Sequence, residues 1–356
     1  MNKNYKVVEL DKQEEYIKKF LKLPKKLYSK KELMQNVEEE RDILEGNHIL
    51  SNYFEVHSFL ELNNKEEAIA RAVVTFYPND ENAYVGYYEC IEDIEASNLI
   101  LSHIEKFIAR NGYKNIIGPL NCSFWIGYRF KTNNFGKPYT GEPYNKEYYP
   151  KFFESAGYKV MQEYTSNAFS RVDKKQKNAI FSDRLAHMRE KGYEFIEPND
   201  DTFDGQLRLI GSMILDLYSK FPTYKKIENE EFYELYKDLK KIVDYSMIKL
   251  AYFNGEMVGF FVAIPNYGNS INTKNYTKII LKKFQKKEYI LMYLGVKKEH
   301  LGLGRALAEC MKEELKSNGA SSIGALIKKG NANKAYFKEL IKQEYNYVLF
   351  SKNIDY

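Results

Sequence analysis

The chain repeats one order of secondary-structure elements, and this repeat restricts its fold more than any other feature. A helix expected to end at Asn111-Gly112 aligns with a helix expected to end at Asn318-Gly319, which places IEKFIARNG over MKEELKSNG. The strands that follow, KNIIGPL and SSIGALI, then agree within one residue. Because Asn-Gly is a common stop for a helix, two independent units are the alternative explanation. We interpret the pattern as an internal duplication, which predicts two similar units.

Both halves show the same order of strands and helices, judged from alternating and helical spacing of apolar residues. In the first half we expect strands at 5–10, 54–61, 67–77, 84–89, 114–118 and after Gly157, with helices in 11–45, interrupted at Pro24, and at 95–110 and 148–155. In the second half we expect helices near 202–220, 228–241, 305–317 and 333–340, and strands at 246–253, 257–265, 289–296, 322–327 and 345–354. A charged helix, 171–192, connects the halves.

The composition is that of a globular protein of two domains. Hydrophobic residues make up 44% and charged residues 29% of the 356 residues, which is enough for a core in each half. The three cysteines are far apart, which argues against a disulfide framework or a zinc site, and we expect no metal.

Charge and hydropathy exclude further classes of protein. The net charge of +5 comes from interspersed signs, so we expect no nucleic-acid partner. The 31 Tyr and 22 Phe residues are expected in the core and in pocket walls. No stretch reaches the roughly 18 apolar residues of a membrane helix and no leader is visible, so we expect a cytoplasmic protein without a membrane span.

The segment YLGVKKEHLGLGRALAECM, residues 293–311, carries the strongest chemical signal. A strand ends, a short turn brings Gly302 and Gly304, and a helix begins at once. Free backbone N–H groups and the positive end of the helix dipole then converge on one point, which suits a phosphate. A tight turn between strand and helix without a ligand is the alternative.

This segment resembles the GNAT (GCN5-related N-acetyltransferase) superfamily, whose motif is Gln/Arg-x-x-Gly-x-Gly/Ala between a strand and a helix. The six positions are Leu301, Gly302, Leu303, Gly304, Arg305 and Ala306, and Leu301 departs from the usual Gln or Arg. The resemblance extends to the hairpin 252–265, the strand 322–327 and the segment 330–337, and so covers most of 245–354.

The whole chain also resembles bacterial tandem-GNAT proteins with a GPxN and a PYN-x-x-Y-Y segment, here residues 118–121 and 143–149. The resemblance implies an α/β (α+β) fold of two tandem units, each a mixed, mostly antiparallel sheet flanked by helices. We expect an N-terminal domain at 1–170, the connecting helix at 171–192, and a C-terminal domain with the acyl-CoA site at 193–356.

The first copy is expected to lack a cofactor site. The alignment sets Ile94-Glu95-Ala96-Ser97 against Leu301-Gly302-Leu303-Gly304, so the first copy has no glycine there. Glu95, with the nearby Glu92 and Asp93, would repel a phosphate. One acyl-CoA site per chain follows from this difference.

The resemblance implies direct attack of an amine on the thioester of acetyl-CoA or another acyl-CoA, with a small-molecule or peptide amine as acceptor. Backbone at Leu294, Gly295 and Val296 is expected to point an N–H at the carbonyl oxygen, with Gly295 as the place where the strand splays. Tyr336 is expected to donate the proton to the leaving thiolate, with Phe337 or Lys338 as alternatives for its place in the helix. Asn331 either bonds the pantetheine arm or caps the helix.

Three further points stay open at the level of the sequence. Glu256, Glu299 and His300 are candidates for the base, and attack through a water needs none of them. The aromatic stretch Pro119–Asn145 either walls an acceptor pocket between the halves or folds on its own side chains. Transfer of a long acyl or aminoacyl group, and CoA binding or ligand sensing without catalysis, are the alternative functions.

Overall fold

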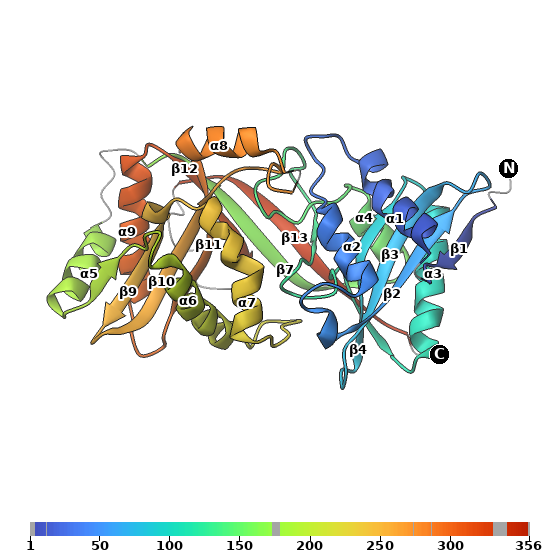
Figure 1. The fold of residues 1–356 in the computed structure, drawn as a ribbon, viewed down its shortest axis with the longest axis horizontal. Coiled ribbons are helices and arrows are strands. Elements are labelled where there is room, and N and C mark those ends of the chain that lie inside the picture. Colours follow the sequence, from blue (N-terminus) through green and yellow to red (C-terminus); the bar gives the residue numbers. More distant parts are fainter. Residues whose placement is uncertain are drawn as a thin grey trace. The chain divides into compact units, whose positions relative to one another are not determined.

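The computed structural model describes residues 4–11, 13–172, 179–272, 274–285, 287–329 and 340–354. They form two compact units: unit 1 is Met1–Tyr164 with Asn346–Tyr356, and unit 2 is Thr165–Tyr345 (Figure 1). The last segment of the chain therefore belongs with the first unit. The contiguous boundaries 1–170, 171–192 and 193–356 stay a prediction.

Unit 1 is a mixed sheet in the order β1-β2-β3-β4-β5-β13, antiparallel except for the parallel pair β4 and β5. Its strands are β1 (Lys6–Glu9), β2 (Glu55–Leu62), β3 (Ala68–Phe76), β4 (Asn82–Cys90), β5 (Asn115–Gly118) and β13 (Ile341–Asn353), with the short β6 (Phe130–Lys131) beside β13. Its helices are α1 (Glu14–Leu27), α2 (Val37–Glu45), α3 (Ile94–Arg110), α4 (Tyr149–Ser155) and the short turn η1 (Ser51–Tyr53).

Unit 2 repeats this sheet in the order β8-β9-β10-β11-β12-β7, where β11 and β12 form the parallel pair. Its strands are β7 (Lys159–Phe169), β8 (Glu194–Ile196), β9 (Ile248–Phe253), β10 (Glu256–Pro265), β11 (Glu288–Val296) and β12 (Ser321–Lys328). Its helices are α5 (Ala179–Glu190), α6 (Phe203–Leu217), α7 (Asn229–Tyr236), α8 (Tyr276–Gln285), α9 (Leu303–Ser317) and the short η2 (Lys237–Lys241) and η3 (Tyr245–Met247).

The two sheets share one register, which supports the duplication. Asn82 lies opposite Asn115 in unit 1, and Tyr289 lies opposite Ser322 in unit 2. These pairs stand at the same distances along the chain from Asn111-Gly112 and Asn318-Gly319. Each sheet also ends with the last strand of the other repeat, since β13 pairs with β5 and β7 neighbours β12.

The expected interruption at Pro24 is wrong, because Pro24 lies inside α1, which continues to Leu27. Proline has no N–H to donate to the carbonyl four residues earlier. Here the Phe20 carbonyl accepts instead from Nη1 of the buried Arg71 at 3.1 Å. This replacement satisfies the group that would otherwise break the helix.

Each sheet has its own apolar core, formed where a long helix covers one face. In unit 1, Ile100, Ile104 and Ile108 of α3 are fully buried against β3 and β4. In unit 2, α9 lies between the sheet and α5 and buries Leu303 and Leu307 completely. The predicted α/β class with mixed, mostly antiparallel sheets is confirmed. Among the described residues, no helix is both long enough and apolar enough to cross a bilayer.

Candidate functional site

Strand β11 leaves its parallel neighbour halfway along its length. Pairing between β11 and β12 ends where Leu291 lies opposite Gly324, although β11 continues to Val296 and β12 to Lys328. On its other side β11 stays paired with β10 as far as Val296. Leu326 in β12 adopts a φ of 55° and donates its N–H to Ser166 Oγ of β7 at 2.9 Å. The edge of β11 after Leu291 is therefore not covered by β12.

A β-bulge falls at the same place. Tyr293 lies opposite Val262 and Leu291 lies opposite Ala263, so Met292 is an extra residue in β11. A bulge bends a strand and turns its backbone groups away from the regular ladder. The irregularity lies at Met292 and not at Gly295, where the sequence suggested it.

The predicted oxyanion residues Leu294, Gly295 and Val296 follow the bulge, opposite Phe261, Phe260 and Gly259. Gly295 is buried, and Leu294 and Val296 are half-buried. A Cβ at Gly295 would lie 2.4 Å from the Phe260 ring and 2.8 Å from Leu217. Glycine is thus required at position 295 because the Phe260 ring packs directly against it.

The turn after β11 leads directly into α9. Gly302 is the N-cap of α9, with a φ of 89° that favours glycine, and no side chain caps the helix. The N–H groups of Leu303 and Arg305 donate to the carbonyls of His300 and Gly302. Within the described part of the chain, the N–H of Gly304 has no acceptor. A free amide at an uncapped helix N-terminus is a site that favours an anion.

The six motif residues divide by their environment. Leu303 and Ala306 are fully buried, and Leu303 packs beneath Gly259, where an added Cβ would lie 3.0 Å from Leu303 Cδ2. Leu301 is 84% exposed and Arg305 is exposed, while the two glycines are half-buried. The departure at Leu301 therefore removes a polar surface side chain and leaves the backbone of the turn unchanged.

Arg184 brings a positive charge to this turn and was not found by sequence reasoning. A Cβ built on Gly302 would lie 3.1 Å from Arg184 Nε and 3.2 Å from Cζ, so the guanidinium lies directly against the glycine. Arg184 is on α5, the helix expected only to connect the halves, and it is half-buried next to Leu185. The spacing of Phe181, Leu185 and Met188 predicts that α5 packs on another helix, but only the structure identifies α9 as that helix.

Three tyrosines gather beside the bulge and were also missed. Tyr293 is the residue after Met292, and its hydroxyl lies 3.4 Å from the hydroxyl of Tyr236 on α7. Tyr218, after α6, meets the ring of Tyr293 edge-on at 6.1 Å, and burial raises the pKa of Tyr218. The hydroxyls of Tyr293 and Tyr236 are thus polar groups close to the bulge.

The base candidates from the sequence have other partners or face solvent. Glu256 forms an exposed ion pair with Lys297, whose hydrogen bond lowers the pKa of Glu256. His300 Nδ1 lies 2.7 Å from the Tyr193 hydroxyl, and its ring packs against Phe253. Glu299 is exposed. Tyr336, its alternatives Phe337 and Lys338, and Asn331 lie outside the described residues, so their roles stay predictions.

In unit 1 the corresponding space holds the chain itself. After β5, the Leu120 N–H donates to the Val85 carbonyl at 2.8 Å, and Asn121 Oδ1 accepts from the N–H of Tyr87 at 2.7 Å. Tyr87 lies at the bulge of β4, with a φ of 47°. A Cβ at Gly86 would lie 2.0 Å from the Leu120 carbonyl oxygen. The GPxN segment therefore covers the edge of β4 in unit 1. In unit 2, β12 does not cover the corresponding edge of β11.

The N-terminus of α3 is occupied as well. Asp93 is the N-cap, and its carboxylate accepts from the N–H of Glu95 at 3.0 Å and from the Tyr5 hydroxyl at 2.8 Å. Ser97, which aligns with Gly304, is fully buried and accepts from the Tyr88 hydroxyl at 2.7 Å. A carboxylate of the chain thus takes the place that an anionic ligand would need.

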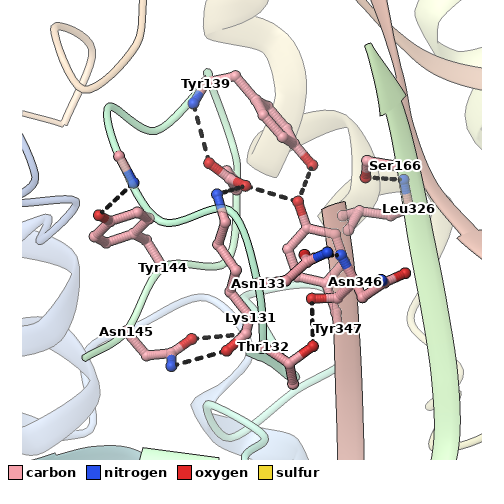
Figure 2. Close-up of polar contacts among 12 residues, drawn as sticks. Lys131, Thr132, Asn133, Tyr139, Tyr144, Asn145, Ser166, Leu326, Asn346 and Tyr347 are labelled. Carbon is pink, nitrogen blue, oxygen red and sulfur yellow. Dashed lines mark hydrogen bonds and ion pairs between the residues drawn. The ribbon is translucent and has the colours of Figure 1, made fainter. Parts of the chain in front are cut away.

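The aromatic stretch Pro119–Asn145 packs inside unit 1 around a buried ion pair (Figure 2). Lys131 Nζ lies 2.6 Å from Glu142 Oε1, and both side chains are 1% exposed. The Tyr347 hydroxyl of β13 donates to the same oxygen at 2.7 Å and lies 3.1 Å from the Tyr139 hydroxyl. Burial lowers the pKa of Lys131 and raises that of Glu142. Losing one partner of such a pair costs about 3–5 kcal/mol, so the cluster holds β13 in unit 1.

No protein-family model and no curated protein matches this sequence. The solved structures that are similar in fold include the following two. A tandem GNAT protein from the clavulanic acid biosynthesis pathway, solved without AcCoA, has a TM-score of 0.56 and 9% identity, with 99% of each chain covered. A GCN5-related glucosamine N-acetyltransferase region of a fungal multi-domain β-N-acetylglucosaminidase has a TM-score of 0.55 and 11% identity, with 99% of this chain and 38% of that chain covered.

The likeness to these structures covers 99% of this chain and so spans both units. The chain therefore has the tandem GNAT fold, with two units of that fold in one polypeptide.

Proposed function

We propose that the chain is an N-acyltransferase that moves an acetyl or other short acyl group from acyl-CoA to a primary amine, with one site in unit 2. The observation that carries the proposal is the coincidence of an uncovered, bulged strand edge with an uncapped helix N-terminus. Met292 and the N–H of Gly304 mark these two features. The corresponding features of unit 1 are both occupied by the chain.

The residues at α9 fit the diphosphate of a CoA thioester. The Gly304 N–H and the helix dipole favour an anion, and Arg184 adds a full positive charge from α5. Gly302 and Gly304 leave the backbone open to close approach. The first motif position is Leu301, which offers neither a cation nor a side-chain amide. In the proposed site, Arg184 supplies the positive charge instead.

The uncovered edge of β11 fits the pantetheine arm. That arm contains amide groups, and an extended chain of amides pairs with a free strand edge as another strand would. The backbone from Met292 to Val296 lies beyond the end of the pairing with β12 in unit 2 and is the edge that we assign to this arm. The thioester would then lie near the bulge, where an N–H turned out of the ladder stabilises the oxyanion.

In the proposed reaction the amine nitrogen attacks the thioester carbonyl carbon, a C–N bond forms and the C–S bond breaks. One proton leaves the amine and one reaches the thiolate. The Tyr293 and Tyr236 hydroxyls lie beside the bulge and are the described groups that we assign to the acceptor side. Tyr336 stays the proposed donor to the thiolate and Asn331 the proposed partner of the pantetheine arm.

One of the fold neighbours is named a glucosamine N-acetyltransferase region, and glucosamine carries a primary amine. This name supports a primary amine as the acceptor class for the present chain. A non-catalytic CoA-binding module is the second candidate, because Glu256 and His300 are held by Lys297 and Tyr193. Release of free CoA in the presence of an amine panel separates the two, and donor chains of increasing length separate short acyl from long acyl or aminoacyl transfer.

The test is calorimetric titration of acetyl-CoA into the wild type and into Gly304→Glu. A carboxylate at the helix N-terminus opposes the diphosphate, so we expect affinity to fall about 100-fold, or about 2.7 kcal/mol. Gly304 does not have a positive φ, so the backbone tolerates the change.

Gly205→Glu is the matched control. Gly205 lies in the first turn of α6 in the same unit, where an added Cβ meets no atom within 4 Å. We expect this variant to bind acetyl-CoA as the wild type does. Equal affinity in Gly304→Glu and Gly205→Glu, with both folded by circular dichroism, would reject the site.

A further inference from the structure

Unit 2 contains a helix for which unit 1 has no counterpart. The antiparallel strands β3 and β4 are joined by residues 77–81, whereas the corresponding strands β10 and β11 are joined by residues 266–287, which contain α8 (Figure 1). The short connection shows that this hairpin of the fold needs no helix. The presence of α8 therefore calls for a reason other than folding.

The outer face of α8 is apolar and exposed. Four large side chains lie on one side of the helix by their spacing, and only Ile279 is buried against the unit. The exposed set is Tyr276 (67%), Ile280 (57%), Leu281 (56%) and Phe284 (82%). Phe284 has nearly the exposure of an isolated side chain. Large exposed apolar patches on a protein mark contact sites.

The segment around this face is strongly basic. Residues 266–287 contain six lysines and no Asp or Glu. Lys278 is exposed on α8, and Lys282 and Lys283 donate to the backbone carbonyls of Asn266 and Lys241. An amphipathic helix with an apolar face and flanking lysines is typical of segments that lie in the surface of an anionic membrane.

We propose that α8 docks the protein on an anionic lipid surface, with the four exposed side chains entering the boundary between headgroups and acyl chains and the lysines contacting lipid phosphates. The charge favours lipid over a second copy of this chain, because a twofold contact through α8 would bring like-charged lysines together. The proposal concerns location at a bilayer surface and is independent of the proposed acyl transfer.

The test is co-sedimentation of the full chain with vesicles of phosphatidylglycerol and phosphatidylcholine in equal parts, and with phosphatidylcholine alone. We expect binding to the mixed vesicles, at least about tenfold weaker binding to phosphatidylcholine, and a marked loss as salt rises from about 0.05 to 0.5 M. The double variant Ile280→Glu/Phe284→Glu should not sediment with either vesicle. Lys278→Gln should bind about fivefold more weakly.

Leu209→Glu is the matched control, because Leu209 is an apolar residue of α6 in the same unit and is 47% exposed. This variant should sediment as the wild type does. Absence of wild-type binding to the mixed vesicles, or equal binding of the double variant, would overturn the proposal. So would a dimer in solution that the double variant abolishes, since the face would then serve a second copy.

Discussion

The two units place the same strands in the same register but treat the edge of the central strand in opposite ways. In unit 1 the chain after β5 turns back along β4, and Leu120 and Asn121 bond to Val85 and Tyr87. In unit 2, β12 turns away from β11, and Leu326 bonds to Ser166 instead. Counted from the two Asn-Gly pairs, Gly86 corresponds to Tyr293. Glycine is needed at position 86 because the chain at Leu120 packs directly against it. In the described part of unit 2 no such segment packs on β11 from β12, so a tyrosine fits at position 293.

The helix N-termini differ in the same sense. Asp93 caps α3 with a carboxylate, whereas α9 begins at Gly302 without a side-chain cap and lies against Arg184. One copy therefore satisfies its own backbone groups, and the other leaves the N–H of Gly304 without an acceptor among the described residues, as the proposed acyl-CoA site requires. The comparison teaches that a few residues outside the sheet can change the helix N-terminus and the strand edge of a duplicated unit, while the sheet itself stays the same.

The largest effect is expected from Gly86→Ala in unit 1. The added Cβ would lie 2.0 Å from the backbone oxygen of Leu120, and Leu120 cannot move away without breaking the hydrogen bond from its N–H to the Val85 carbonyl. We expect the free energy of unfolding to fall by about 3 kcal/mol, measured by urea denaturation. Affinity for acetyl-CoA at unit 2 should stay unchanged in the folded protein.

Gly205→Ala in unit 2 is the control, since it meets no atom and replaces a helical glycine. It should stabilise the protein by about 0.5–1 kcal/mol. If Gly86→Ala were as stable as the wild type, the GPxN segment would not lie tightly against β4.

A smaller effect is expected from the carboxylates beside α3. Burial, and then the charge of Asp93, raise the pKa of Glu61 to about 8. The folded state then binds more protons than the unfolded state between about pH 4.5 and pH 8, so the free energy of unfolding falls as pH rises across this window. Glu61 is fully buried, and we expect the free energy of unfolding to fall by up to about 1.4 kcal/mol per pH unit within this window.

Glu61→Gln should remove this part of the pH dependence, which urea titrations from pH 5 to pH 9 measure. Burial also raises the pKa of Glu89 to about 7, so Glu61→Gln should flatten the curve without making it level. Identical curves for wild type and variant would show that Glu61 is ionised and partnered in the folded protein.

The smallest effect is expected from Arg184→Gln in unit 2. Removing the charge beside Gly302 should weaken acetyl-CoA binding about fivefold to tenfold at low salt, and the difference should shrink as salt rises. Arg189→Gln on the same helix is the control, because Arg189 packs against Phe195. Equal loss in both variants would assign the effect to general charge and not to the turn at Gly302.

Sequence reasoning predicted most of the described strands and helices of both repeats, with errors at particular places, and the expected helix at 333–340 lies almost wholly outside the described residues. Pro24 did not end α1, because Arg71 replaces the missing donor from another part of the chain. The basic, amphipathic α8 was missed because its apolar residues face outward and lack the strand or core pattern expected between β10 and β11. Sequence reasoning also missed that β7 joins the sheet of unit 2 and that β13 joins the sheet of unit 1. Nothing in the local sequence indicates which sheet an edge strand joins.

The sequence by itself determined the repeated order of elements and the turn at Gly302 and Gly304, because periodicity, Asn-Gly stops and glycine before a helix act over a few neighbouring residues. The fold class followed from the resemblance to a known family. Only the tertiary structure decided that Arg184 lies on that turn, that Tyr293 and Tyr236 meet beside Met292, and that Leu120 covers β4. These contacts join residues far apart in the chain, and their free energy depends on packing and burial that no local pattern encodes.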